Sequence, residues 1–446
     1  MQKIITRGAI TLYLIMGFFI FSACDTGQEP IDENEENGQE IVTLHVVTNM
    51  EDGEEGSLRQ LIEEAAAGDT ITFDPGLDGK PIIIQSDRLL ISGRTLTIIG
   101  RGTDKTIISG DGRYGVFQIG ETLDLLQNVT ISDLAIIDGY AERGAGIYII
   151  SGDVTLDNLL ISNNIAEVIG GGITNNTANV TIQNSSIKDN VAPTRAGIAN
   201  SGNMDIILSE VAYNYAKKVT ATVSIGGGIY NSGSLTIRKS YIHNNIADNG
   251  AGIVAGVGNL QMYHSTIAYN TAHRGGGLIA MEGGKAFLEN CTISKNEATE
   301  YGGGVEARNG YITIHFSTVA DNTPDDIHRR QFARREHYPQ IKNSLVAGSI
   351  PYSIDSNGYN LFSQSADWNH DTDIVSEELY TGELSDNGGH TYTIALLEGS
   401  PAIDAAEPSA SLEDDQRNYH RPVDGGSGEP LPDIGAFEFN SEPAGD

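Results

Sequence analysis

The chain has 446 residues, of which 27 are Lys or Arg and 60 are Asp or Glu, giving a formal net charge of −33. So acidic a chain lacks the basic surface that phosphate backbones require, which excludes nucleic acid as the main partner. Glycine contributes 53 residues, and because glycine disfavours helix interiors, the composition favours a fold with many repeated turns.

Residues 1–23 have the pattern of a secretion signal, with Lys3 and Arg7 before an apolar run and small residues after it. The stretch FSAC at residues 21–24 resembles a bacterial lipobox. The resemblance implies cleavage before Cys24 and lipidation of that residue, hence an exported protein anchored by lipid to the outer membrane or surface of a bacterium. The alternative is an ordinary signal peptide that contains a chance cysteine. Only Cys291 remains, so the mature fold has no intramolecular disulfide.

Residues 24–41 are predicted to be an acidic tether, because residues 25–40 contain seven acids, no basic residue and almost nothing apolar. Acidic residues after a lipidated cysteine resemble a surface-display signal in some bacterial groups. Asp25 beside the cysteine resembles an inner-membrane retention signal in others. The sequence therefore does not determine which membrane carries the lipid anchor.

Residues 42–137 are interpreted as an N-terminal cap followed by irregular first coils. Ser57 and Gln60 have the spacing of a capping box, and Gly68 is expected to end the helix that they begin. The apolar face of this helix comprises Leu58, Leu61, Ile62 and Ala65. We expect it to cover the open end of a stack of strands, where unpaired backbone groups are a hazard.

Residues 138–350 contain a repeat marked by two independent residues. The residue after each glycine cluster recurs at intervals of 26, 25, 31, 24, 25 and 27 residues: Ile147, Ile173, Ile198, Ile229, Ile253, Leu278 and Val305. A downstream asparagine keeps the same period: Asn164, Asn190, Asn214, Asn245, Asn270, Asn296 and Asn322. The long step has an insertion at residues 217–224, interpreted as a loop on one coil. A fixed period of this length predicts a solenoid.

Apolar residues alternate with period two inside each unit, as in Ile312 and Ile314, which predicts strands. About 25 residues accommodate three short strands and three turns, so the predicted fold is an all-β, right-handed parallel β-helix. The asparagines are expected to form a ladder of stacked amides at a bend. Cys291 aligns with serines in the other coils and is expected to be an inward packing residue rather than a nucleophile.

Three groups of motifs resemble known families. The stretch from Ser57 to the TLTIIGRG motif resembles the start of many secreted right-handed β-helix proteins. The GGGI and I-x-x-N motifs resemble the repeats of chlamydial polymorphic outer-membrane proteins, an adhesin family. Within residues 351–440, interpreted as C-terminal coils before a tail at 441–446, the words LSDNGGHTYTIALLEGSPAIDAA, DDQRNYHRP and DIGAFEF resemble the choice-of-anchor Q domain of bacterial surface proteins. The resemblance implies a pectate-lyase-like fold on an exported protein, without implying lyase activity.

Outward positions near the bend supply the candidate glycan-binding residues, because aromatic rings stack on sugar faces while Arg, Lys and His bond hydroxyls or carboxylates. These positions are Arg238, Lys239, Tyr241, His243, Tyr263, His264, Tyr269, His315 and Phe316. Several adjacent rows form an elongated surface that suits a chain-like ligand. The alternative is ordinary stacking between coils on a solvent-facing surface.

Residues 328–342 have five basic residues and one acid in this acidic chain, which predicts an anion-binding loop or a merely solvated insertion. The anion-binding candidates are Arg329, Arg330, Arg334 and Arg335. The adjacent Asp325, Asp326 and His328 form the one tight acid–histidine–basic group on the repeat. No Gly-His-Gly stretch, as in polygalacturonase-like enzymes, is found, and glycoside hydrolysis needs two carboxylates across a cleft. No catalytic residue is therefore predicted.

Metal binding is supported only by two acidic loops, with Asp371 and Asp373 in one and Asp414 and Asp415 in the other, and neither has an EF-hand spacing. No cofactor is expected, with calcium the one open possibility. The sequence thus predicts a non-catalytic cell-surface lipoprotein that mediates adhesion or binds polysaccharide on the host or a neighbouring cell. The alternatives are a polysaccharide lyase or glycoside hydrolase acting on an acidic glycan, and a purely structural spacer.

Overall fold

A computed structural model describes residues 9–11, 42–123, 127–217, 223–331, 333–410 and 412–443. The predicted signal peptide, Cys24 and the acidic tether lie outside these residues, apart from strand β1 (Ala9–Thr11), which pairs antiparallel with β2 (Thr43–Val47). Residues 218–222 of the predicted insertion also lie outside them.

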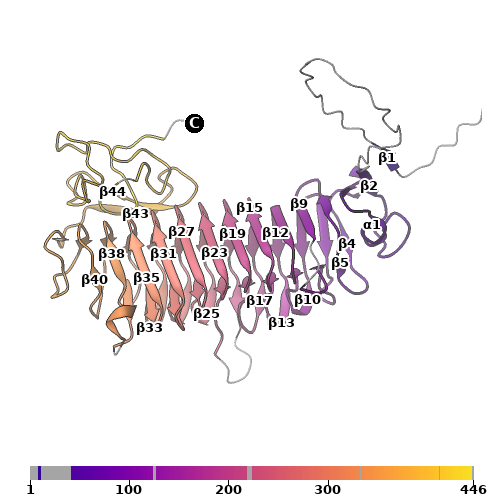
Figure 1. Ribbon diagram of the computed structural model, residues 1–446, viewed down its shortest axis with the longest axis horizontal. Coiled ribbons are helices and arrows are strands. Elements are labelled where there is room, and N and C mark those ends of the chain that lie inside the picture. The colour runs from indigo at the N-terminus through magenta and orange to yellow at the C-terminus, as the bar shows by residue number, and fades with distance from the viewer. Residues whose placement is uncertain are drawn as a thin grey trace, which may run out of the picture.

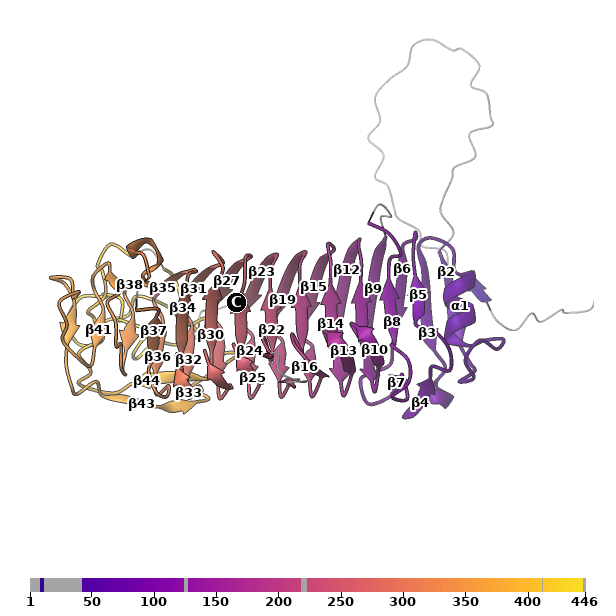
Figure 2. The ribbon, with the colours of Figure 1, turned by 90° about the horizontal axis from the view of Figure 1, so that it is seen from below.

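The described residues form a right-handed parallel β-helix, as predicted, whose coils stack along one axis (Figures 1 and 2). Three sheets build the stack, parallel except where β1 pairs with β2, and the longest of them bends within each coil. This long sheet contains β1 (Ala9–Thr11), β2 (Thr43–Val47), β3 (Asp69–Phe73), β4 (Lys80–Ile83), β6 (Leu96–Ile99), β7 (Thr106–Ser109), β9 (Asn128–Ile137), β12 (Asp153–Ser162), β15 (Asn179–Gln183), β16 (Ser186–Lys188), β19 (Asn203–Ile207), β20 (Glu210–Ala212), β23 (Ser234–Arg238), β24 (Tyr241–His243), β27 (Asn259–Tyr263), β28 (Thr266–Ala268), β31 (Lys285–Glu289), β32 (Thr292–Ser294), β35 (Tyr311–His315), β36 (Thr318–Ala320), β38 (Gln340–Lys342), β39 (Leu345–Val346), β40 (Asp355–Ser356), β41 (Leu361–Phe362) and β42 (Ile374–Val375).

The other two sheets complete each coil. The first comprises β5 (Leu89–Ile91), β8 (Phe117–Ile119), β11 (Ile147–Ile149), β14 (Ile173–Asn175), β18 (Ile198–Asn200), β22 (Ile229–Asn231), β26 (Ile253–Ala255), β30 (Leu278–Met281), β34 (Val305–Arg308) and β37 (Ile327–Arg329). The second comprises β10 (Tyr140–Arg143), β13 (Ile165–Ile169), β17 (Val191–Ala192), β21 (Tyr215–Ala216), β25 (Ile246–Asn249), β29 (Thr271–Arg274) and β33 (Glu297–Tyr301).

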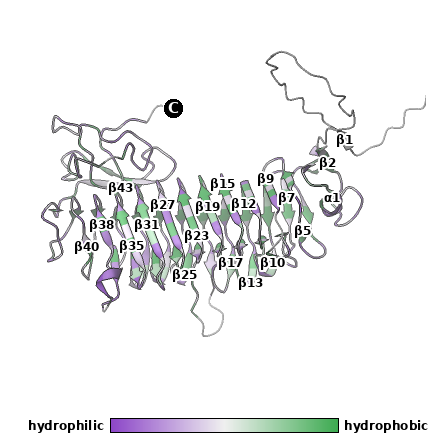
Figure 3. Ribbon diagram, in the orientation of Figure 1, coloured by the Kyte–Doolittle hydropathy of each residue, from purple (hydrophilic) through white to green (hydrophobic). Residues whose placement is uncertain are grey.

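The predicted register is confirmed. Ile147 pairs with Ile173, which pairs with Ile198, and Ile198 pairs with Ile229 across the 31-residue step, so the insertion leaves the stack undisturbed. These side chains are fully buried in one continuous apolar core. Figure 3 shows the resulting alternation of hydrophobic and hydrophilic residues along the strands.

Each coil turns twice at single residues in the left-handed region, first before the inward serine row and then before the inward asparagine row. At the first bend lie Asn158, Asn184, Leu208, Lys239, His264, Asn290 and Phe316, and at the second lie Asn163, Asp189, Tyr213, Asn244, Tyr269, Lys295 and Asp321. Left-handed conformations are costly for residues other than glycine, asparagine and aspartate. The hydrogen bonds that follow each bend offset this cost.

The predicted asparagine ladder is confirmed. In each rung one amide nitrogen donates to the amide oxygen of the next coil, as from Asn164 Nδ2 to Asn190 Oδ1 at 3.0 Å. The ladder ends where Asn322 Nδ2 donates to Asp326 Oδ1 at 2.8 Å. Cys291 lies in the serine row as predicted; it is fully buried, and burial raises the pKa of its thiol to about 12.

Helix α1 (Leu58–Glu64) covers the N-terminal end of the stack, as expected (Figure 2). Ser57 Oγ accepts a hydrogen bond from Gln60 N at 3.3 Å, whereas Gln60 Oε1 accepts from Gly56 N at 2.6 Å, one residue earlier than a standard capping box requires. Arg94 donates to backbone carbonyls at the other end of the helix, which satisfies groups that the helix leaves unpaired.

Two 3₁₀ turns, η1 (Pro75–Leu77) and η2 (Arg335–His337), lie in loops. The coils end at β42, and the chain then folds back along one side of the last coils, where β43 (Thr381–Ser385) and β44 (Thr393–Leu396) form an antiparallel hairpin (Figure 1). We call residues 376–443 the C-terminal flap.

Candidate functional site

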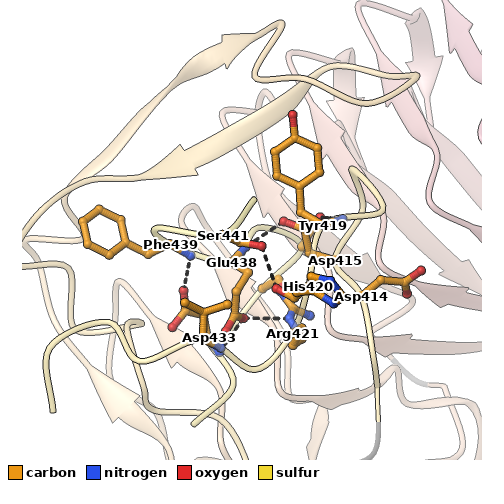
Figure 4. A network of polar contacts seen from close by, with 12 residues as sticks. Asp414, Asp415, Tyr419, His420, Arg421, Asp433, Glu438, Phe439 and Ser441 are labelled. Atoms are coloured by element: carbon orange, nitrogen blue, oxygen red, sulfur yellow. Dashed lines mark hydrogen bonds and ion pairs between the residues drawn. The ribbon is translucent and has the colours of Figure 1, made fainter. Parts of the chain in front are cut away.

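The flap is held together by a buried ionic network whose residues come from the DDQRNYHRP and DIGAFEF motifs (Figure 4). Arg421 Nε lies 2.8 Å from Glu438 Oε2, with both side chains fully buried. Asp415 Oδ2 lies 2.7 Å from Arg417 Nη2. Burial and the adjacent Glu438 carboxylate raise the pKa of Asp433 to about 8. Because both arginines are paired and inaccessible, this network fixes the flap rather than binding a ligand.

The flap also covers the face of the long sheet beyond the first bend. Arg421 Nη1 donates to Asn290 Oδ1 at 3.1 Å, and its guanidinium lies 4.8 Å from the centre of the Phe316 ring. Thr266 Oγ1 donates to Tyr392 O at 2.6 Å, and Thr292 Oγ1 donates to Gln416 Oε1 at 2.6 Å. The last coils are therefore closed to a ligand on this face.

The predicted glycan-binding surface is interrupted at three residues, two of them by the flap and the third by a partner on the long sheet. Phe316 was expected to face solvent, but this expectation is wrong because the flap buries it completely. His264 Nε2 lies 3.1 Å from Asp414 Oδ1 of the flap. His315 Nδ1 lies 2.8 Å from Glu289 Oε2. These side chains are engaged within the protein.

The same face stays open over the preceding coils, where it forms a groove of about 790 Å³. Lys188, Glu210, Lys239 and Tyr241 line it from successive coils, and His390 reaches it from the flap. The groove therefore unites two predicted candidates, Lys239 and Tyr241, with residues that the sequence-based prediction missed.

The groove has a defined polar arrangement. Glu210 Oε1 lies 2.7 Å from His243 Nε2, and Ser186 Oγ donates to Glu210 Oε2 at 2.8 Å. The hydrogen bond from His243 lowers the pKa of Glu210, so this carboxylate is ionised at neutral pH. The Tyr241 ring stacks on His243 at 4.0 Å, and burial raises the pKa of the Tyr241 phenol. A fixed aromatic ring, one carboxylate and two lysines thus face the groove.

Among the described residues that line the groove, Glu210 is the one acid. Hydrolysis of a glycosidic bond needs a pair of carboxylates on opposite sides of that bond. This arrangement can hold a sugar chain but lacks the pair that hydrolysis requires.

The missed residues had a signal in the sequence. Ser186, Glu210 and Tyr241 occupy one outward register position, followed by Thr266 in the next coil. Extending the register of Tyr241 toward the N-terminus identifies Glu210 and, two residues beyond Ser186, Lys188. His390 and Tyr392 gave no such signal, because their approach depends on the folding back of the flap.

The other predicted candidates lie elsewhere. The Arg238 guanidinium lies 5.1 Å from the centre of the Tyr263 ring, on the segment of the long sheet before the first bend. Tyr269 lies at the second bend and is 40% exposed. These residues do not face the groove.

The anion-binding candidates divide between buried and exposed residues. Arg329 was expected in an open loop, but it is buried, with its guanidinium 4.0 Å from the Tyr338 ring centre and its Nε donating to Ser353 O at 2.7 Å. Arg330, Arg334 and Arg335 are exposed.

The adjacent aspartates have backbone partners. Asp325 Oδ1 accepts from Gly302 N at 2.6 Å, and Asp325 Oδ2 lies 3.1 Å from His328 Nδ1. Asp326 terminates the asparagine ladder, and burial raises the pKa of its carboxyl to about 7. Both carboxylates are therefore occupied in closing the last turns.

In the first acidic loop Asp373 Oδ1 accepts from Asn360 N at 3.0 Å, and Asn360 Oδ1 in turn accepts from Ser344 N, which closes the serine row. Within the described residues, no group of three or more His, Cys, Asp or Glu side chains is arranged to hold a metal ion. No helix in the described part of the chain is long and apolar enough to span a membrane.

Residues 217–333 match the family model described as "Right handed beta helix region". No curated protein matches the chain. Among solved structures, the crystal structure of pectate lyase Pel9A is similar to the chain, with 14% sequence identity, a TM-score of 0.44, and coverage of 86% of this chain and 90% of that chain. The family match agrees with the observed fold, and neither match identifies a ligand of this chain.

Proposed function

We propose that this chain is a non-catalytic, lipid-anchored surface protein that binds an acidic polysaccharide in the groove beside the flap. The observation that carries the proposal is the convergence of Lys188, Lys239 and Tyr241 on one groove. In a chain with a net charge of −33, two lysines on one concave surface create a local site for carboxylate groups. The Tyr241 ring is held by His243 at 4.0 Å and Tyr392 at 5.5 Å, and its phenol can bond a sugar hydroxyl in the groove.

The geometry also favours a chain-like ligand. Successive coils lie about 4.8 Å apart, and each contributes one row of outward side chains. Lys188, Glu210 and Lys239 come from three consecutive coils, so a ligand in the groove lies along the β-helix axis. Tyr392 of the flap is centred 5.5 Å from Tyr241 and marks the end of the groove.

Isothermal titration of the full-length chain in detergent with polygalacturonate oligosaccharides tests this proposal. Lys188→Ala and Tyr241→Ala should each weaken binding at least about tenfold, equivalent to about 1.4 kcal/mol. Lys217→Ala removes the same charge from an exposed position outside the groove, directly after β21, and should have no effect. If Lys217→Ala weakens binding and Lys188→Ala does not, the ligand occupies another surface and the proposal is wrong.

The same samples test the enzymatic alternative. Ultraviolet absorbance of unsaturated products detects lyase activity, and reducing-end formation detects hydrolysis. Turnover that is lost in Glu210→Gln would replace the binding proposal with an enzyme acting in this groove. Binding without turnover, unchanged by EDTA, is the expected result.

The anchor is proposed from the lipobox resemblance of residues 21–24. Cells expressing the chain should incorporate labelled palmitate into it, and Cys24→Ser should abolish the incorporation. Protease accessibility on intact cells then distinguishes display on the surface from an inward-facing anchor. Retention of the label in Cys24→Ser would refute lipidation at this residue.

A further inference from the structure

A second depression, of about 690 Å³, lies on the segment of the long sheet before the first bend. Its floor consists of outward residues of β27, β31, β35 and β38, and Glu336 and Tyr338 of the loop after β37 form one wall. The flap and the groove face the segment after the bend. The depression is therefore a separate surface, on coils closer to the C-terminal end of the β-helix.

Three aromatic rings line this depression. Phe287 is half-buried in the centre of the floor, and Tyr311 is 37% exposed. The Tyr338 ring is held by the Arg329 guanidinium, 4.0 Å from its centre, and Arg329 is itself fixed by hydrogen bonds to three backbone carbonyls. The buried arginine thus positions an aromatic wall.

The amide side chains around the rings have no hydrogen-bond partners in the described protein. The side chains of Asn259, Gln261 and Gln340 are exposed, and none hydrogen-bonds to another described residue. In earlier coils the row that contains Asn259 pairs its side chains: Asn179 Nδ2 donates to Asp153 Oδ1 at 2.7 Å, and Asn203 Nδ2 donates to Asn179 Oδ1 at 2.8 Å. This pairing stops where the depression begins.

The register arranges these groups in two rows along the axis. One row runs from Asn259 through Lys285 to Tyr311, and the other from Gln261 through Phe287 and Thr313 to Gln340. Lys285 and Glu336 have opposite charges, so the lining has no net charge. Sites for neutral ligands combine apolar and aromatic surface with a few polar groups that fix orientation.

We propose that this depression is a second carbohydrate site, which takes a neutral polysaccharide by stacking sugar rings on Phe287, Tyr311 and Tyr338 and by hydrogen bonds from the three free amides. The site is independent of the acidic-polysaccharide groove. Where both are occupied, one molecule bridges a neutral chain and an acidic chain.

Affinity electrophoresis of the full-length chain in gels containing soluble hydroxyethyl cellulose, glucomannan or laminarin tests the site, with polygalacturonate gels run in parallel. At least one neutral polymer should retard the protein. Phe287→Ala and Tyr311→Ala should each lower that affinity about tenfold or more, Phe287→Trp should retain it, and polygalacturonate binding should be unchanged. Tyr215→Ala, which removes a 41% exposed ring from another sheet, is the matched control.

Three results would overturn the inference: no retardation by any neutral polymer, equal loss in Phe287→Ala and Tyr215→Ala, or loss of polygalacturonate binding in Phe287→Ala. Thermal unfolding of each variant checks that the fold is retained. The groove variant Lys188→Ala should leave neutral-polymer binding intact. Failure of the groove and failure of the depression are therefore separate outcomes.

Discussion

Replacing Glu306 with glutamine should remove one of several contributions to the pH dependence of unfolding, beside those of the buried Asp326 and Asp433. Glu306 lies on the outer side of β34 and is fully buried, and neither carboxylate oxygen has a hydrogen-bond partner in the described part of the chain. Burial raises its pKa from 4.5 to about 7, although Arg308, His328 and Arg274 favour the charged form. Loss of hydration, without compensating hydrogen bonds, is therefore the dominant influence on the pKa of Glu306.

The magnitude follows from this shift. The unfolded chain releases the Glu306 proton near pH 4.5, whereas the folded chain keeps it to about pH 7. Between these values the folded state binds more protons, so the free energy of unfolding falls as pH rises. At about 1.4 kcal/mol per pH unit, the loss reaches on the order of 3 kcal/mol above pH 7.

Urea unfolding followed by circular dichroism, at intervals from pH 5 to pH 8, measures this loss. Glu306→Gln should be less pH-dependent than the unchanged chain by on the order of 3 kcal/mol over this range. Glu377→Gln makes the same chemical change at an exposed position and should leave the profile as it was. A change in stability that is the same at every pH does not affect the comparison, because the measured quantity is the slope of the free energy of unfolding against pH. Parallel profiles for Glu306→Gln and the unchanged chain would refute the reasoning.

Three further substitutions or treatments probe the scaffold. Asn245→Ala removes a ladder amide that bonds to Asn214 and Asn270 and should cost about 2–4 kcal/mol in urea unfolding, while the exposed Asn179→Ala should cost much less. Phe316→Ala should cost about 3–5 kcal/mol and make the flap susceptible to limited proteolysis before the coils; simultaneous digestion of both would contradict an independent flap. Cys291 should resist thiol-reactive reagents in the folded chain at pH 8 and react in urea, because burial raises its pKa to about 12; rapid labelling of the folded chain would contradict its inward placement.

The repeat could be predicted because each coil stacks on the next in one register. The residues after the glycine clusters and the ladder asparagines must recur at the coil period, since a single-residue slip would expose the core face. Ile147, Ile173 and Asn164 therefore mark the fold in the sequence. Local capping chemistry also allowed α1 to be placed, although the partner of Gln60 is Gly56 rather than Ser57.

The surface could not be predicted to the same extent, because it depends on contacts between distant parts of the chain. His264 and Asp414 are separated by 150 residues, and nothing near His264 in the sequence indicates this partner. Phe316 occupies a position that faces outward in every coil, yet the flap buries it. Periodicity determines which side of a strand a residue occupies, and it does not determine whether that side meets solvent.

The outward positions nevertheless distinguish the coils that the flap covers from those it leaves open. At one register position the coils present Ser186, Glu210 and Tyr241, and then Thr266, Thr292 and Thr318. A packed interface between two backbone layers favours small side chains, whose hydroxyls bond to the flap, whereas charged and large aromatic side chains require space or solvent. The change from tyrosine to threonine coincides with the edge of the flap at Tyr392, which accepts the Thr266 hydrogen bond. The fold constrains the inward residues of the repeat but not the outward ones. The change from large to small side chains along this outward row therefore locates the boundary of the flap. The same boundary is the end of the open groove.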